Sequence, residues 1–148
     1  MDQTDLDAFV SSVTRYFEAA TNAPAEVGTP YLSSEGTRHA QDYTGIIGIS
    51  GRSRGCVYFT ASAPMLKHLV LCIGETDTSH DMLCDMVGEI ANTISGNARS
   101  YFGAEFMVSV PVVVSGSDGT VRLPSDLRSF VIPITWKRFE SALVVCLE

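Results

Sequence analysis

The sequence has few basic residues. Lys and Arg number 10 against 17 Asp and Glu, which gives a formal net charge of −7 over 148 residues. Nucleic acids and anionic membranes attract proteins through positive charge, so we expect neither as the main partner. Long apolar runs are also lacking: the longest, Met65–Ile73, contains Lys67 and His68 and is far too short to span a bilayer. The acidic opening, Met1–Asp5, predicts no secretory signal, so we expect a cytoplasmic protein.

Cysteine and histidine are scarce as well. The 4 cysteines include no CxxC pair, and the 3 histidines follow no spacing typical of zinc sites. We therefore expect buried free thiols in a reducing compartment, and neither a disulfide framework nor a metal bound by this chain. The cysteines are Cys56, Cys72, Cys84 and Cys146.

Hydrophobic residues, in contrast, are plentiful. They make up 45% of the chain and charged residues 18%, which excludes intrinsic disorder as the default state. A chain of this length buries roughly 70% of the surface that it exposes when unfolded, enough for a core without disulfides or metals. Neither a linker nor a low-complexity tract interrupts the sequence. It therefore predicts one domain over residues 1–148.

The hydrophobic pattern changes several times between helical and strand periodicity. It predicts helices over residues 5–20, 62–73 and 79–102, each followed by turn or strand signals. Predicted strands are a short irregular edge strand within 27–32, a hairpin of 42–50 and 56–60, and β structure over 105–114, 129–135 and 139–147, with a turn at 115–119. This order predicts an α+β fold with a mostly antiparallel sheet packed with helices.

The third predicted helix has a polar stripe along one face. At about 100° per residue, Asp81, Asp85, Glu89 and Asn92 fall within roughly 80° of one another. Like charges four residues apart repel, and the next basic residue along the helix is Arg99, so the stripe favours a role in binding positive charge. The opposite arc is apolar and is expected to be buried; it contains Leu83, Met86, Val87, Ile90, Ile94 and Tyr101.

Two glycines, Gly88 and Gly96, flank the stripe on the same helical wheel. Each costs about 1 kcal/mol relative to alanine inside a helix. We expect them to let a partner approach the backbone closely beside Glu89 and Asn92. The alternative is that they allow the helix to pack closely on the sheet, but both wheel angles point away from the apolar arc.

The residues of this helix resemble a known active-site motif. Asp85-x3-Glu89-x2-Asn92, followed by residues 93–98 (Thr-Ile-Ser-Gly-Asn-Ala), closely resembles the active-site helix of the CheC/CheX/FliY family of chemotaxis phosphatases. The single copy of the motif, the chain length and the order of elements look most like CheX. The first predicted helix has no E-x-x-N, so one active site is expected.

The resemblance implies a hydrolase that removes phosphate from the phospho-aspartate of a CheY-like receiver domain in two-component signalling. Within the family, the glutamate (here Glu89) pairs with the receiver's active-site lysine, and the amide (here Asn92) orients the attacking water. Asp85, and more weakly Asp81, would support docking. The Mg²⁺ belongs to the receiver, so this chain would bind no metal or other cofactor. CheX-like proteins also form homodimers by strand exchange, which the β-rich segment after residue 105 could support.

Two other functions remain open from the residues alone. A non-catalytic module that docks and sequesters a receiver would use the same acidic stripe, but would depend little on Asn92. A metal-dependent hydrolase could use Asp81, Asp85 and Glu89 as oxygen ligands. One face of one helix rarely completes a magnesium shell, however, and no histidine lies on this face.

Overall fold

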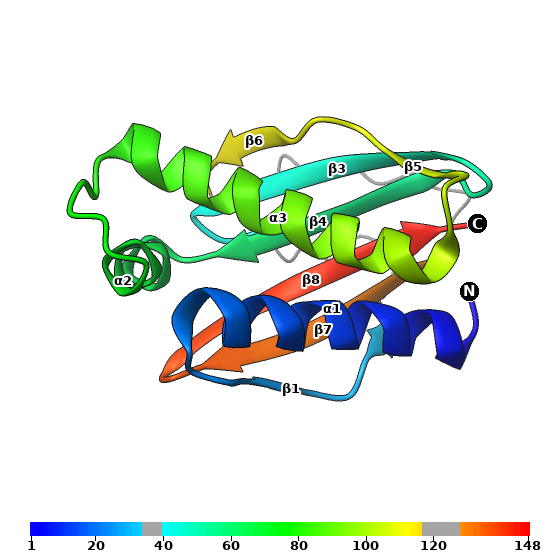
Figure 1. The fold of residues 1–148 in the computed structure, drawn as a ribbon, viewed down its shortest axis with the longest axis horizontal. Coiled ribbons are helices and arrows are strands. Elements are labelled where there is room, and N and C mark those ends of the chain that lie inside the picture. The colour runs from blue at the N-terminus through cyan, green and yellow to red at the C-terminus, as the bar shows by residue number, and fades with distance from the viewer. Residues whose placement is uncertain (34–39, 117–127) are drawn as a thin grey trace.

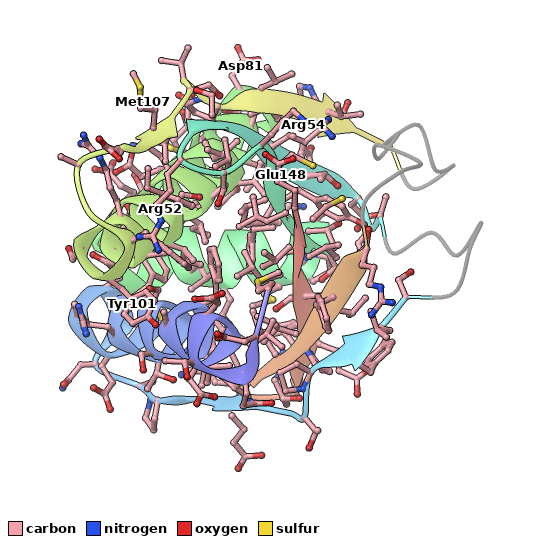
Figure 2. All side chains as sticks on the ribbon, turned by 90° about the vertical axis from the view of Figure 1, so that its right-hand side faces the viewer. Arg52, Arg54, Asp81, Tyr101, Met107 and Glu148 are labelled. Carbon is pink, nitrogen blue, oxygen red and sulfur yellow. The ribbon has the colours of Figure 1, made fainter. Side chains whose placement is uncertain are left out.

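The computed structural model describes residues 1–33, 40–116 and 128–148. Within these ranges, an eight-stranded sheet has three helices on one of its faces (Figures 1 and 2). The helices are α1 (Gln3–Thr21), α2 (Ala63–Cys72) and α3 (His80–Phe102). The strands are β1 (Ala25–Val27), β2 (Tyr31–Leu32), β3 (Tyr43–Gly51), β4 (Gly55–Ala61), β5 (Phe106–Val108), β6 (Val112–Ser115), β7 (Ser129–Trp136) and β8 (Phe139–Leu147).

All the strand pairs described in the sheet are antiparallel. The order is β1-β7-β8-β4-β3-β5, with β2 beside β7 and β6 beside β3. Side chains alternate across the central strands, so Phe59 and Leu143 face the helices whereas Tyr58 and Val144 form a smaller cluster on the other face. The α+β fold with a mostly antiparallel sheet, predicted from the hydrophobic pattern, is confirmed.

The helices begin where local capping chemistry allows. The Asp2 side chain accepts a hydrogen bond from Asp5 N at 2.9 Å and the Asp5 side chain accepts one from Asp2 N, so α1 begins two residues before the predicted start. Ser62 caps α2, and Gly103, with a φ of 95°, ends α3 as predicted. Every helix among the described residues is too short or too polar to cross a bilayer.

The segment predicted as one strand over 105–114 forms two. Between β5 and β6, the Ser109 hydroxyl accepts a hydrogen bond from Gly48 N at 2.8 Å and so replaces a backbone partner. Pro111 has no N–H to continue the ladder, and pairing with β3 resumes at Val112. The predicted turn at 115–119 lies partly outside the described residues.

Two predictions of burial are wrong. Tyr101, placed in the apolar arc of the long helix, is 50% exposed because it lies in the last turn, near the end of the helix layer. Cys72 is exposed at the end of α2, whereas Cys146 is buried and Cys56 and Cys84 are half-buried. All four cysteines are free, as predicted.

Helix α3 approaches the sheet closely at Gly45 of β3. A Cβ at this position would lie 2.6 Å from the carbonyl oxygen of Val87 and 3.2 Å from Ala91 Cβ, both on α3. The glycine therefore lets α3 lie directly on the sheet, with Val87 and Ala91 fully buried. This contact sets the distance between α3 and the sheet. It therefore also sets the position of the outer face of the helix.

We expect Gly45→Ala to destabilise the protein by about 1–3 kcal/mol, because the added methyl group meets backbone that cannot move without lifting α3. Urea unfolding followed by circular dichroism measures this loss. An unchanged unfolding midpoint would contradict the close packing of α3 on β3.

Candidate functional site

Hydrogen bonds at both ends of α3 hold the helix in place, and with it the outer face. Ser79 Oγ accepts from Met82 N at 3.3 Å, and Asp77 Oδ1 accepts from Ser79 N at 2.9 Å. The hydrogen bonds that Asp77 accepts from Ser79 lower the pKa of its carboxyl. At the other end, the Arg52 guanidinium donates to the carbonyl of Phe102 at 2.9 Å. These contacts satisfy groups that an isolated helix leaves unpaired, so α3 is a well-anchored platform.

The predicted polar stripe is present on this outer face. The side chains of Asp81, Asp85, Glu89 and Asn92 are all exposed. The opposite side of the helix is in the core, with Leu83, Val87, Ile90 and Ile94 at most 2% exposed. The helical wheel therefore predicted correctly that these four side chains are exposed.

The two flanking glycines differ from each other. Gly88, predicted to admit a partner, is buried: a Cβ there would lie 3.2 Å from Val113 Cγ2 and 3.6 Å from Pro111, so the glycine makes room for β6. The prediction for Gly88 is thus wrong, and the alternative of close packing on the sheet is correct. Gly96 is exposed, and a Cβ there would have nothing within 4 Å. It remains open to a partner.

Negative charge dominates the stripe. Within residues 1–33, 40–116 and 128–148, no basic side chain forms an ion pair with Asp81, Asp85 or Glu89. Burial, followed by the charges of Asp81 and Asp85, raises the pKa of the neighbouring Cys84 thiol, which keeps it protonated. The unpaired carboxylates make this face attractive to a cationic partner.

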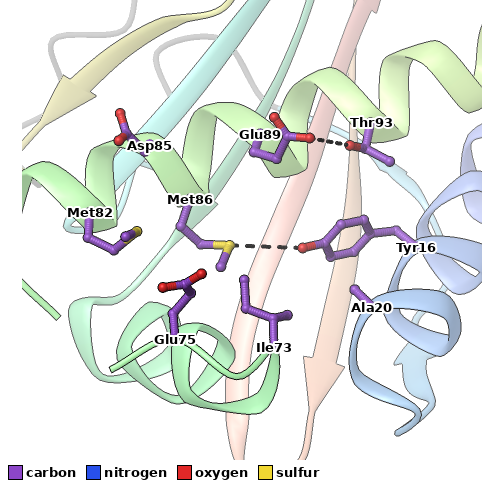
Figure 3. A pocket seen from close by; sticks show the side chains of 9 residues that line it. All are labelled: Tyr16, Ala20, Ile73, Glu75, Met82, Asp85, Met86, Glu89 and Thr93. Atoms are coloured by element: carbon purple, nitrogen blue, oxygen red, sulfur yellow. Dashed lines mark hydrogen bonds between the residues drawn. The ribbon is translucent and has the colours of Figure 1, made fainter. Parts of the chain in front are cut away.

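A groove lies directly beside the stripe, on the side of α3 that faces α1 (Figure 3). Its volume is about 430 Å³, and it lies between α1, the segment after α2 and α3. Glu89 stands on its rim, where its carboxylate accepts a hydrogen bond from Thr93 Oγ1 at 3.4 Å. The lining residues are Tyr16, Ala20, Ile73, Glu75, Met82, Asp85, Met86, Glu89 and Thr93.

Sequence patterns did not predict this groove. Tyr16 comes from α1 and Glu75 from the loop after α2, and only tertiary packing brings them beside α3. Tyr16 is 7% exposed, and burial, followed by the charge of Glu89, raises its pKa to about 12. The one signal for the groove in the sequence was Tyr16, a residue with a hydroxyl at a buried position of a helix. This signal does not indicate which other element faces the hydroxyl.

The acidic residues do not converge on a metal site. Within the described part of the chain, no group of three or more His, Cys, Asp or Glu side chains could hold a metal ion. Asp81, Asp85 and Glu89 follow one another along the helix, so they do not form the ligand set that a metal-dependent hydrolase would need.

Comparisons with known proteins agree with this fold and show its family. The family model described as chemotaxis phosphatase CheX matches residues 43–135. A CheC-like superfamily protein from Shewanella sp. PV-4 is 25% identical, with a TM-score of 0.86, and the match covers 100% of this chain and 99% of that chain. No curated protein matches the sequence.

Two further solved structures share the fold. A chemotaxis protein CheX from Desulfovibrio desulfuricans is 25% identical, with a TM-score of 0.83, over 98% of this chain and 99% of that chain. A chain in the CheX–CheY–BeF₃–Mg²⁺ complex from Borrelia burgdorferi is 14% identical, with a TM-score of 0.77, over 97% of both chains.

The family model identifies the class of protein. This chain, with its helix-covered antiparallel sheet, is a chemotaxis phosphatase, and it is therefore a hydrolase. The matched residues include all of α3 and most of the sheet. The chain belongs to the CheX family.

Proposed function

We propose that the protein hydrolyses the phospho-aspartate of a CheY-like receiver domain, with Glu89 and Asn92 as its catalytic residues. The observation that carries this proposal is the placement of both side chains, exposed and three residues apart, on a helix fixed at its ends and along its buried face. Three residues rise about 4.5 Å along a helix, so both groups can reach one small site on a partner.

Glu89 has the role of binding the receiver's active-site lysine. Its carboxylate is exposed, and within the described residues only the hydroxyl of Thr93 donates a hydrogen bond to it. A charge-assisted hydrogen bond to an ammonium group is stronger than this neutral contact, so binding of the lysine would displace it. The pairing would place α3 over the receiver's phosphorylation site.

Asn92 has the role of holding the attacking water. Its amide can accept from water through the oxygen and donate through the nitrogen, so it can fix both position and orientation. The water oxygen forms a bond to phosphorus as the bond from phosphorus to the aspartate oxygen breaks. The products are the free aspartate carboxylate and inorganic phosphate, which takes both protons of the water and can release one of them to solvent. Positioning suffices because an acyl phosphate is already reactive.

The partner and its metal are proposed by analogy with a solved complex. The Borrelia burgdorferi complex contains CheX, CheY, BeF₃ and Mg²⁺. By analogy, the partner here is a phosphorylated CheY-like receiver, and Mg²⁺ would be held by that receiver and supply charge neutralisation at the phosphoryl group. Asp85 and Asp81, one and two turns before Glu89, would contact basic groups on the receiver. We place this reaction in the cytoplasm, where receivers act.

Gly96 would lie under the receiver at the other end of the stripe, and this assignment is testable. We expect Gly96→Ala to raise the free energy of unfolding by about 0.5–1 kcal/mol, because alanine is the better helix former and nothing lies near the added methyl group. The same variant is expected to bind an activated receiver less tightly. Chemical denaturation and a binding titration measure the two effects. Greater stability with unchanged affinity would remove Gly96 from the interface.

The whole chain would act as a single phosphatase domain that forms a homodimer. The edge of the sheet near β5 and β6 is apolar and exposed: Met107 is 55%, Val110 83% and Val112 60% exposed, and Met107 projects from this edge in Figure 2. Pairing with a second copy, with or without exchanged strands, would cover it. Sedimentation velocity at several concentrations tests for the dimer.

The proposed activity is tested by measuring phosphate release from a phosphorylated, Mg²⁺-bound CheY-type receiver with and without this protein. Acceleration supports a phosphatase. Binding without acceleration would instead indicate a module that only docks and sequesters the receiver.

A further inference from the structure

The groove beside Glu89 has an apolar floor and an acidic rim. Met86 is 5% exposed, and it forms the floor together with Met82 and Ile73, which is itself 44% exposed (Figure 3). Methionine side chains adapt their shape to what binds them, so this floor suits a flexible, unbranched alkyl chain. The groove is open to solvent.

The rim carries only one sign of charge. Glu75, Asp85 and Glu89 project from three positions around the groove, and none of the described lining residues is basic. The lining therefore combines apolar surface with unneutralised carboxylates. Lysine and arginine have the complementary character, since each buries an aliphatic stem while its charged end remains at a polar boundary.

Tyr16 provides an independent indication that the groove takes a polar group. Its side chain is only 7% exposed, and among the described residues the one partner of its hydroxyl is the thioether of Met86, at 4.0 Å. A buried tyrosine hydroxyl usually has a strong hydrogen-bond partner, and a sulfur at this distance is a weak one. The neutral hydroxyl has oxygen lone pairs that can accept a hydrogen bond from a cationic head group.

We propose that this groove binds a lysine or arginine side chain of the receiver domain, with its stem over Met82 and Met86 and its charged end between Glu75 and the Tyr16 hydroxyl. This basic residue is a second one, separate from the lysine assigned to Glu89. The inference rests on the proposed function, since it needs a receiver seated on α3. It adds a specificity determinant: only receivers with a basic side chain at this distance from the phosphorylation site fit well.

The test combines kinetics with a matched pair of variants. Glu75→Lys reverses a rim charge, whereas Glu18→Lys makes the same change in net charge at an exposed position of α1 that does not line the groove. We expect Glu75→Lys to raise KM for the phosphorylated receiver by roughly tenfold with little change in kcat, and Glu18→Lys to leave both near the wild-type values. An unchanged KM, an equal rise in both variants, or a loss confined to kcat would contradict the proposal.

A second measurement reports on the groove itself. In protein labelled at the methionine methyl groups, addition of receiver activated with BeF₃⁻ and Mg²⁺ should shift the resonances of Met82 and Met86 but not that of Met107, which lies on β5. Unshifted Met82 and Met86 signals would contradict the proposal whether or not phosphate is released. Turnover that depends on Asn92 but is insensitive to Glu75 would leave the phosphatase function intact and remove only the groove.

Discussion

Replacing Asn92 by alanine is expected to reduce receiver dephosphorylation by about a hundredfold to a thousandfold. The expected loss equals the advantage of a held water over a freely diffusing one, and removal of a single preorganised hydrogen-bonding group has effects of this size in other hydrolases. The side chain is exposed, and alanine favours helix, so the fold of α3 should be unaffected. Binding of the activated receiver should change by no more than about threefold.

Steady-state phosphate release with a phosphorylated CheY-type receiver measures the loss, and a BeF₃⁻ titration measures the binding. Asn97→Ala is a matched control, because it makes the same change on α3 at a half-buried position outside the polar stripe. That variant should retain most of the turnover. Full activity in Asn92→Ala would eliminate the water-holding role.

Replacing Glu89 by lysine is expected to weaken receiver binding by about thirtyfold or more. The variant would put a positive charge where the receiver's lysine must approach, and reversal of a charge at a close contact costs at least about 2 kcal/mol. The side chain is exposed, and among the described residues it accepts one long hydrogen bond, from Thr93 Oγ1 at 3.4 Å, so the free energy of unfolding should change little.

Isothermal titration with the BeF₃⁻-activated receiver measures this effect. Glu89→Gln serves as the control, since it keeps the shape of the side chain and removes only its charge; an intermediate loss is expected. Unchanged affinity in Glu89→Lys would exclude Glu89 from the interface and would leave its neighbours on the stripe to account for docking.

Much of the fold could be predicted from the sequence because its signals are local. Ser62 caps the start of α2, and Ser79 and Gly103 bound α3, so the observed helices agree with the predicted ranges to within one residue. The exposure of the four polar residues of α3 could also be predicted, because the apolar arc opposite them is long and regular. Where a boundary depended on a longer-range partner, as at Ser109 and Gly48, the prediction was wrong.

Predictions about the flanks of α3 needed information that one helix cannot provide. A helical wheel separates the buried face from the exposed face, but it does not show that Val113 of β6, and Pro111 just before this strand, cover Gly88 on one flank. Gly96, two turns further on, lies beyond that strand and is open. The two glycines looked alike in sequence because the difference between them arises from an element more than ten residues away.

The groove was not predictable for a related reason. Its walls come from α1, the segment after α2, and α3, and Tyr16 and Met86 are 70 positions apart in the chain. Tyr16 could be recognised as a core residue by its position on α1, but the weak partner of its hydroxyl becomes visible only when the three elements are assembled.

Catalysis, as distinct from docking, is the central claim, and it is tested most directly by adding a small amount of wild-type protein to an excess of phosphorylated, Mg²⁺-bound CheY-type receiver. We expect each molecule of protein to release many equivalents of phosphate, faster than the receiver's own hydrolysis. Release at the receiver's unaided rate, together with measurable binding, would contradict it.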